Sequence, residues 1–246
     1  MRLLILADIH ANWYALETVL ADAEGQYDQV LCCGDLVGYN PHPDRVTEWI
    51  QRNSTYVIRG NHDKVVAGLE RLDWFNEVAQ IAARWTISTM QSSGVEYLRG
   101  LSQGPIATAG FQICHGSPRD EDEYMTNPVE AAPCFEFVSN NLLFFGHSHV
   151  QGGFVQRRNK VLTIGAVKRK EQESVFQLEP DAAYMINPGS VGQPRDGDAR
   201  AAYAIYETDQ KVVTLRRVVY PIMKTATDIR AAGLPDILGM RLIHGM

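Results

Sequence analysis

With 246 residues, 45% of them hydrophobic, the chain is long enough to bury a sizeable α/β core. Its formal net charge of -6 argues against a protein that coats long nucleic acids, because such a protein carries a basic face. No run of about 20 apolar residues occurs, so we expect no membrane span.

The cysteines and the start of the chain indicate a compartment. Two of the four cysteines, Cys32 and Cys33, are adjacent and no CxxC pair occurs, so neither a disulfide framework nor a thiolate zinc site is expected. The apolar stretch 3–7 is too short for the hydrophobic part of a signal peptide. We therefore expect a reduced, cytoplasmic protein.

The first part of the chain alternates strands with helices. Short apolar runs that end in polar residues predict buried strands at residues 2–7, 29–33 and 55–58. Asn12 is expected to cap a helix after the first strand, and Asp44 to begin one after the second. This alternation is typical of a doubly wound parallel sheet, in which the chemistry lies at the carboxyl ends of the strands.

Residues 64–93 are predicted to be mainly helical, with Asp73 as a cap. Apolar side chains recur at helical spacing in this region, namely Trp74, Val78, Ile81, Ala82 and Trp85. We interpret this stripe as buried core rather than as a platform for stacking bases.

Shorter elements follow. Residues 104–114 predict a hairpin that turns at Ala109-Gly110, and residues 142–145 predict another buried strand. The acidic segment 117–127 is interpreted as solvated surface, with a lid over a site as the less favoured alternative. Asn127-Pro128 is predicted to open a helix, with Asn as the cap and Pro as the first residue.

The rest of the chain predicts short strands, at residues 153–157, 160–165, 174–178, 183–187, 201–207 and 211–219. We expect these strands to form a second, mostly antiparallel sheet packed on the first. Residues 222–246 are interpreted as a peripheral helix and a poorly specified tail. Because no internal repeats or Pro/Gly-rich linkers occur, a single domain is expected over residues 1–246.

Polar side chains that can bind metals follow five of the predicted strands. They lie in the motifs DxH, GD, GNHD, HG and GHSH, and comprise Asp8, His10, Asp35, Asn61, His62, His115, His147 and His149. Alternation in an extended segment is expected to point Asp8 and His10 to the same side. A single histidine at a strand end is usually structural. Five of the chain's seven histidines at such positions, beside two aspartates and an asparagine, indicate a metal centre instead.

The order of these motifs resembles the calcineurin-like metallophosphoesterase superfamily, especially its small bacterial and archaeal phosphodiesterases. The resemblance implies an α/β fold of two packed mixed β-sheets flanked by helices, a four-layer α-β-β-α sandwich. It also implies two divalent metal ions, the first held by Asp8, His10 and His149, the second by Asn61, His115 and His147, with Asp35 bridging both. Oxygen and nitrogen donors without thiolate suit Mn, Fe, Zn, Co or Ni.

The same resemblance implies hydrolysis of a phosphate ester by a metal-bridging hydroxide, with His62 as the general acid. Asp63 is expected to cap the following helix rather than to orient that imidazole. A small phosphodiester or dinucleoside polyphosphate is the favoured substrate. A phosphomonoesterase, a nucleotide pyrophosphatase and a non-catalytic protein-binding scaffold remain alternatives, whereas the negative net charge disfavours a nuclease. Homo-oligomerisation is left open.

The second motif departs from one branch of this superfamily. Its protein Ser/Thr phosphatases continue the motif as GDxVDRG, whereas Gly38 and Tyr39 here replace the Asp and the Arg. A phosphoprotein phosphatase is therefore disfavoured, and other groups must recognise phosphate. The candidates are Asn40 in the same loop and two arginines, Arg119 and Arg195, whose forked guanidinium groups suit phosphate oxygens.

Overall fold

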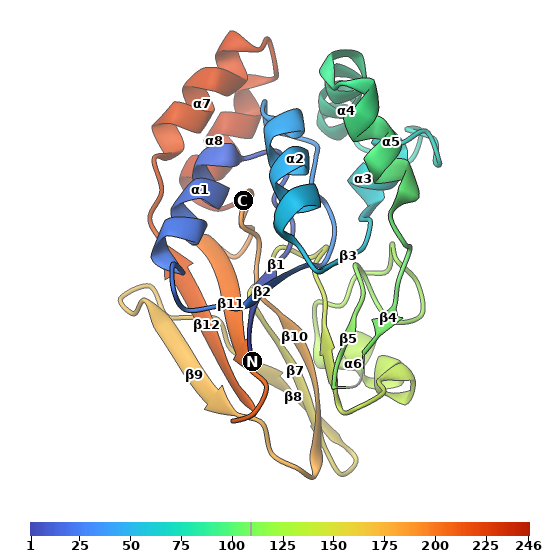
Figure 1. The fold of residues 1–246 in the computed structure, drawn as a ribbon, viewed down its shortest axis with the longest axis vertical. Helices are drawn as coiled ribbons and strands as arrows, with labels where there is room; N and C mark the ends of the chain where they lie inside the picture. The colour runs from blue at the N-terminus through green and yellow to red at the C-terminus, as the bar shows by residue number, and fades with distance from the viewer. Residues whose placement is uncertain (109) are drawn as a thin grey trace.

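The computed structural model describes residues 1–108 and 110–246, in which twelve strands form two six-stranded mixed sheets packed face to face (Figure 1). Apolar clusters join helices to the outer face of each sheet, so the expected four-layer sandwich is confirmed. Most helices lie beside the first sheet and above its upper end in this view. No helix in the described residues is long and apolar enough to cross a membrane.

The first sheet is parallel on one side and antiparallel on the other. Its strands, in spatial order, are β3 (Tyr56–Val57), β2 (Gln29–Cys32), β1 (Arg2–Leu6), β11 (Ala201–Glu207), β12 (Val212–Val218) and β9 (Glu173–Gln177). β1 pairs parallel with β2 but antiparallel with β11. The prediction that the late strands form a sheet of their own is therefore wrong for β9, β11 and β12. They extend the first sheet because the second edge of the buried strand β1 also needs hydrogen-bond partners.

The second sheet combines strands from the middle of the chain with later ones. Its strands, in spatial order, are β4 (Ile106–Ala107), β5 (Gln112–Ile113), β6 (Leu142–Phe144), β10 (Ala182–Asn187), β7 (Gly152–Arg157) and β8 (Lys160–Ile164). β5, β6 and β10 run parallel, and β4 pairs antiparallel with β5. The predicted hairpin at 104–114 is thus confirmed, although Ala109 of its turn lies outside the described residues.

The helices are α1 (Trp13–Asp22), α2 (Pro43–Asn53), α3 (Asn61–Val66), α4 (Glu77–Thr89), α5 (Ser92–Gly100), α6 (Pro128–Ala131), a 3-10 helix (Ala132–Phe137), α7 (Ile222–Ala231) and α8 (Asp236–His244). Asn12 caps α1 by accepting from the Ala15 amide, and Asn127 caps α6 in the same way, as expected. These caps fix where the loops that precede the helices end.

Strand β1 shows how the layers are joined. Leu4 and Leu6 point toward the helices and pack with Leu16 of α1, whereas Leu3 and Ile5 point toward the second sheet. All four strand side chains are fully buried. Burying a side chain of this size contributes about 1.5–3 kcal/mol, so the strand, and the loop at its carboxyl end, are held firmly in place.

The region 64–93 differs from its prediction. The helix α4 begins at Glu77 and is capped by Asn76, not Asp73, and the segment 67–76 consists of turns and bends. Asn76 is the better-placed cap because its Oδ1 accepts from the Ala79 amide three residues later. As a consequence Trp74 lies in the loop before the helix and is 48% exposed, and Ile81 on α4 is 43% exposed, so the assignment of these two residues to the core is wrong.

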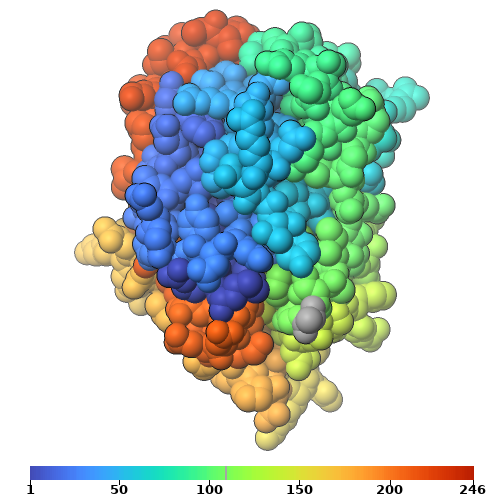
Figure 2. Space-filling view, in the orientation of Figure 1, coloured from blue at the N-terminus to red at the C-terminus, as the bar shows by residue number. Residues whose placement is uncertain are grey.

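The C-terminal tail is also better ordered than predicted. Residues 222–244 form two packed helices, α7 and α8. Their buried side chains, including Leu238 and Leu242, pack in one apolar cluster with Phe75, just before α4, and Ala79 of α4. Figure 2 shows these helices (red) next to the α4 region (green) at the top of the molecule. The tail is therefore part of the frame at the end of the sheets rather than a peripheral appendage.

Candidate metal centre

The motif residues converge because parallel strands of both sheets end at the same edge. The loops after β1 and β2 are joined by a hydrogen bond from the His10 amide to the Asp35 carbonyl, at 2.9 Å. The loops after β5 and β6 are joined by a hydrogen bond from the Gly146 amide to the His115 carbonyl, at 2.8 Å. At Gly60, after β3, a Cβ atom would lie 2.2 Å from Asp35 Oδ1, so only glycine permits this approach.

The backbone is strained where these loops turn. Positive φ angles, between 47° and 64°, occur at Asp8, His10, Asp35, His147 and His149. Such a conformation costs a residue with a Cβ about 1–2 kcal/mol. The prediction that strand alternation aligns Asp8 with His10 is wrong, because β1 ends at Leu6 and both residues are left-handed. A tight turn brings their side chains together instead.

The side chains form two buried groups that share Asp35. Ligand atoms within 4.8 Å of one another come from Asp8, His10, Asp35 and His149 in one group, and from Asp35, His115 and His147 in the other. Asp35 Oδ2 lies 3.4 Å from both His10 Nε2 and His115 Nε2. Asn61 joins the second group, with its Oδ1 3.1 Å from His115 Nε2. The structure therefore brings together the residues of each predicted ligand set, with Asp35 between the two groups.

Each of the four imidazoles in these groups has one ring nitrogen beside a backbone carbonyl. The Nδ1 atoms of His10, His115 and His149 lie 2.9, 2.8 and 2.6 Å from the carbonyl oxygens of Val37, Cys33 and Gln193. His147 Nε2 lies 3.1 Å from the Asp122 carbonyl. A carbonyl can only accept, so each of these nitrogens carries the proton and the opposite nitrogen faces the site. Histidine ligands of metals are typically oriented in this way.

His10 and His149 provide a direct test of whether a cation fits. Burial lowers the pKa of both imidazoles well below the usual range, so both are neutral. Their Nδ1 atoms are the donors, and hence their Nε2 lone pairs face each other at 3.0 Å. Two lone pairs at this distance repel, and a metal ion bound to both removes the repulsion.

The acidic groups lead to the same conclusion. Burial raises the pKa of Asp8 to about 7, and its Oδ2 has no hydrogen-bond partner among the described residues. At His115, burial opposes the charged form, but Asp35 and Asp8 outweigh it and raise the pKa to about 10. The carboxylates thus favour positive charge at this spot. A divalent ion supplies that charge in place of protons, so the donor set fits metal ions.

His62 lies beside these groups but is held differently. Its ring is enclosed by those of Tyr39, Phe75 and His10, with centroids 4.5, 4.5 and 4.8 Å away. Its Nδ1 has no hydrogen-bond partner in the described structure, and the backbone amide donates to Asp35 Oδ1. Asp63 accepts from the amide of Gly60 and from two loop amides, so it anchors the helix start, as predicted, and no hydrogen bond in the described structure joins it to the ring.

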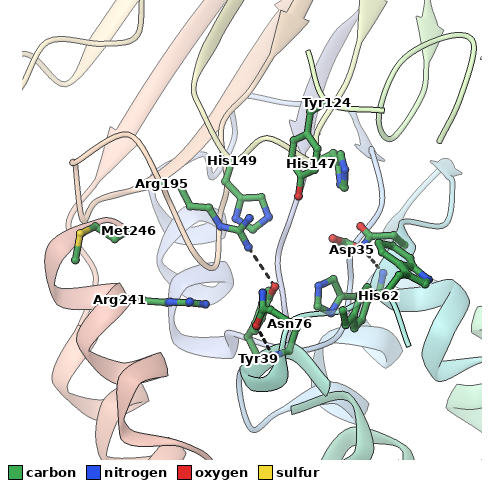
Figure 3. Close-up of a pocket in the computed structure, with 14 residues that line it drawn as sticks. Asp35, Tyr39, His62, Asn76, Tyr124, His147, His149, Arg195, Arg241 and Met246 are labelled. Carbon is green, nitrogen blue, oxygen red and sulfur yellow. Dashed lines mark hydrogen bonds between the residues drawn. The ribbon is translucent and has the colours of Figure 1, made fainter. Parts of the chain in front are cut away.

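The three candidate phosphate-binding residues lie in different places. Arg195 lines the pocket above the metal-ligand groups, with its guanidinium 3.3 Å from the Tyr39 hydroxyl (Figure 3). Asn40 is buried and donates to the His10 carbonyl, so it supports the loop rather than facing the pocket. Arg119 pairs with Glu123 and is absent from the described residues that line this pocket.

The acidic segment 117–127 is fastened over one side of the site, contrary to its interpretation as solvated surface. Glu121 is buried and accepts from Arg59 at 3.0 and 2.9 Å, and Lys64 donates to Asp122 at 2.6 Å. Tyr124 projects from this segment and stacks on His147, with ring centroids 3.9 Å apart. The segment therefore contributes a wall of the pocket.

The pocket extends well beyond the metal-ligand groups, with a volume of about 490 Å³. Its outer part is lined by residues that the sequence did not single out as functional, namely Trp74, Phe75, Asn76, Tyr124, Arg241 and Met246. Asn76 could have indicated this role for Trp74, since an Asn cap there places the tryptophan in a loop. The sequence has no comparable signal for Arg241 and Met246.

The fold and the buried cluster of carboxylates and imidazoles define a metal-dependent phosphoesterase. The family model described as the calcineurin-like phosphoesterase superfamily domain matches residues 1–211, and the chain belongs to this superfamily. The resemblance of its motifs to this superfamily is thus confirmed.

Individual proteins are similar to this chain over nearly its whole length. A metallophosphoesterase structure from Sphaerobacter thermophilus is 38% identical with a TM-score of 0.88, covering 100% of this chain and 99% of its own. An uncharacterized protein from Methanocaldococcus jannaschii is 34% identical over 247 residues, 98% of this chain and 97% of its own. A hypothetical protein from Pyrococcus horikoshii OT3 shares the fold, with a TM-score of 0.78 at 20% identity, covering 100% of this chain and 98% of its own.

Proposed function

We propose that this phosphoesterase hydrolyses a small phosphodiester or dinucleoside polyphosphate with two divalent ions. Asp8, His10 and His149 would hold the first ion, Asn61, His115 and His147 would hold the second, and Asp35 would contribute to both. The observation that carries the proposal is the common arrangement of four imidazoles, each with one nitrogen on a carbonyl and the other toward a carboxylate or another ligand atom. When bound, the ions make water a nucleophile near neutral pH and offset phosphate charge.

In this proposal His62 donates the proton to the leaving oxygen. It lines the pocket beside both ligand groups, and Figure 3 draws its ring pointing toward the space between Asp35 and Arg195. Burial lowers its pKa to about 4, with the charge of Arg195 acting in the same direction. A bound phosphate brings negative charge next to the ring and so favours the protonated form that a general acid requires.

Arg195 is the proposed anchor for the phosphate under attack. Its guanidinium contacts the Tyr39 hydroxyl and Gln193 Oε1, both neutral, so its charge is not neutralised by a carboxylate at these contacts. The same charge acts on both ligand groups. Burial is the main cause of the lowered pKa of His149 and His147, and the charge of Arg195 lowers both further. A forked cation at this position matches phosphate oxygens.

Aromatic side chains at the mouth of the pocket favour a substrate with a planar group. Trp74 and Tyr124 line the pocket and are 48% and 49% exposed, so their rings are accessible to a ligand. Trp74 packs edge to face on Phe75, with centroids 4.6 Å apart. Exposed rings of this kind stack on nucleobases, so a nucleoside ester fits the pocket better than a simple alkyl ester.

The proposal is tested with purified protein loaded with Mn, whose metal content is first measured. Turnover of bis-p-nitrophenyl phosphate and diadenosine tetraphosphate should exceed that of p-nitrophenyl phosphate. Asp35→Asn is the matched inactive control, since it removes one charge from the bridging position. If the monoester is turned over fastest, the protein is a phosphomonoesterase. If a filled metal centre turns over none of the three, the non-catalytic scaffold is the better description.

A further inference from the structure

The pocket contains a second arginine that the proposed chemistry does not use. Arg241 comes from α8 and lines the same cavity as Arg195. Figure 3 draws both guanidinium groups on the same side, opposite Asp35 and His62. No hydrogen bond or ion pair joins the Arg241 guanidinium to any residue that the structure describes.

This lack of a partner distinguishes Arg241 from three other arginines that are partly or fully buried. Arg217 pairs with Asp196, Arg200 with Asp198, and Arg59 with Glu121. Two guanidinium groups that line one cavity without carboxylate partners repel each other unless an anion lies between or beside them. The outer pocket is therefore electrostatically complementary to a polyanion.

The helix that carries Arg241 is fixed relative to Arg195. Gly245, at the end of α8, accepts from the Gly197 amide at 3.0 Å, two residues after Arg195. A Cβ at Gly245 would lie 2.7 Å from the Asp198 backbone, so glycine is needed for this contact. On its other side α8 packs through Leu242 on the cluster that contains Phe75. Arg241 is thus positioned by packing rather than by a polar partner.

We propose that Arg241 forms a subsite for a second phosphate group, adjacent to the phosphate that Arg195 anchors at the metal centre. This inference rests on the proposed function and specifies its substrate as a nucleoside ester with at least two linked phosphates. A single-phosphate diester occupies only the inner part of the pocket and leaves Arg241 without a ligand. The subsite lies outside the region that the family model matches, which ends at residue 211.

The test compares two ligands that differ by one phosphate group. Binding of AMP and of α,β-methylene-ADP, which cannot be hydrolysed between its phosphates, is measured by calorimetry on Mn-loaded protein. Arg241→Gln should weaken binding of the methylene diphosphate at least about tenfold, since hydrogen bonds to charged groups are strong. The affinity of Arg241→Gln for AMP should equal that of the wild type. Arg84→Gln removes the same charge from an exposed position on α4 and is the matched control.

The turnover of bis-p-nitrophenyl phosphate by the same variants separates this inference from the proposed function. Arg241→Gln should leave that rate unchanged. The second subsite is refuted if Arg241→Gln binds both nucleotides as tightly as Arg84→Gln does, or if its affinity for both falls equally. Either result refutes the subsite even when the enzyme hydrolyses the diester. If the wild type hydrolyses no ester, but Arg241→Gln binds α,β-methylene-ADP more weakly than the wild type does, the subsite is supported and the proposed function fails.

Discussion

Gly38→Ala should impair the proposed acid without disturbing the metal ligands. A Cβ at Gly38 would lie 2.5 Å from His62 Nδ1, against the 3.4 Å at which ordinary contacts begin. The imidazole must therefore move by about 1 Å to restore normal contact distances. The rings of Tyr39, Phe75 and His10 enclose it, so the shift disturbs its alignment with the leaving oxygen.

A misplacement of this size costs a catalytic group about 10²-fold in rate. The loss should be seen in kcat for esters with poor, alkoxide leaving groups, which need a proton. It should be small for p-nitrophenyl esters, whose leaving group departs without one. Gly38 has a φ of 93°, so an alanine there also loses about 1–2 kcal/mol of stability. Each kcal/mol lowers the Tm of a protein of this size by about 2–4 °C.

Gly68→Ala isolates the backbone effect. Gly68 has a φ of 73° just after α3, but a Cβ there would meet nothing within 4 Å. This variant should lose comparable stability and keep full activity on every ester, and both variants should retain the wild-type metal content. The reasoning is refuted if Gly38→Ala hydrolyses alkyl esters as fast as Gly68→Ala does, or if its loss is equal for good and poor leaving groups.

Three further outcomes follow from the site. His62→Asn should retain both metals yet lose about 10²–10⁴-fold in kcat on alkyl esters, measured beside elemental analysis; an inactive variant without metal would contradict its role as acid. Asp35→Asn should bind less of both ions, because its carboxylate lies 3.4 Å from a ligand nitrogen of each group, and loss of one ion alone would disprove the bridge. Arg195→Gln should raise KM about tenfold at unchanged metal content, whereas Arg119→Gln should leave it unchanged, because Arg119 is already paired with Glu123. Equal KM values in these two variants would contradict the proposed anchor.

The convergence of the candidate ligands could be predicted because their positions depend on local pattern. Each ligand follows a short apolar run, and several sit beside a glycine that permits an abrupt turn, as Gly60 does before Asn61. Adjacent parallel strands end at the same edge, so ligands distant in sequence meet there. The sequence could not show how the chain turns. The left-handed backbone at Asp8 and His10 follows from the packing of neighbouring loops, not from strand periodicity.

The assignment of strands to sheets could not be predicted for a related reason. An alternating apolar strand fits either sheet of a sandwich equally well, and the choice depends on which edge lacks a partner. β11 pairs with β1, about two hundred positions earlier in the chain, as the register of Leu4 with Ile205 shows. The prediction for Trp74 is wrong for a different reason. Its spacing suits a helical stripe, but the helix begins only after the Asn76 cap, so the ring is exposed at the pocket.

In the proposed function and subsite, chemistry and selectivity depend on different parts of this chain. The proposed metal ligands are buried, and several are strained, so a change at the strand ends disturbs the whole centre. Arg241 lies on a helix beyond the matched family region and makes no polar side-chain contact in the described structure. The helix is held through apolar side chains such as Leu238 and Leu242, which pack with Tyr39 and Phe75 next to His62. The proposed subsite residue Arg241 can therefore change without displacing a proposed ligand, so α8 can adapt the reaction centre to a particular phosphate ester.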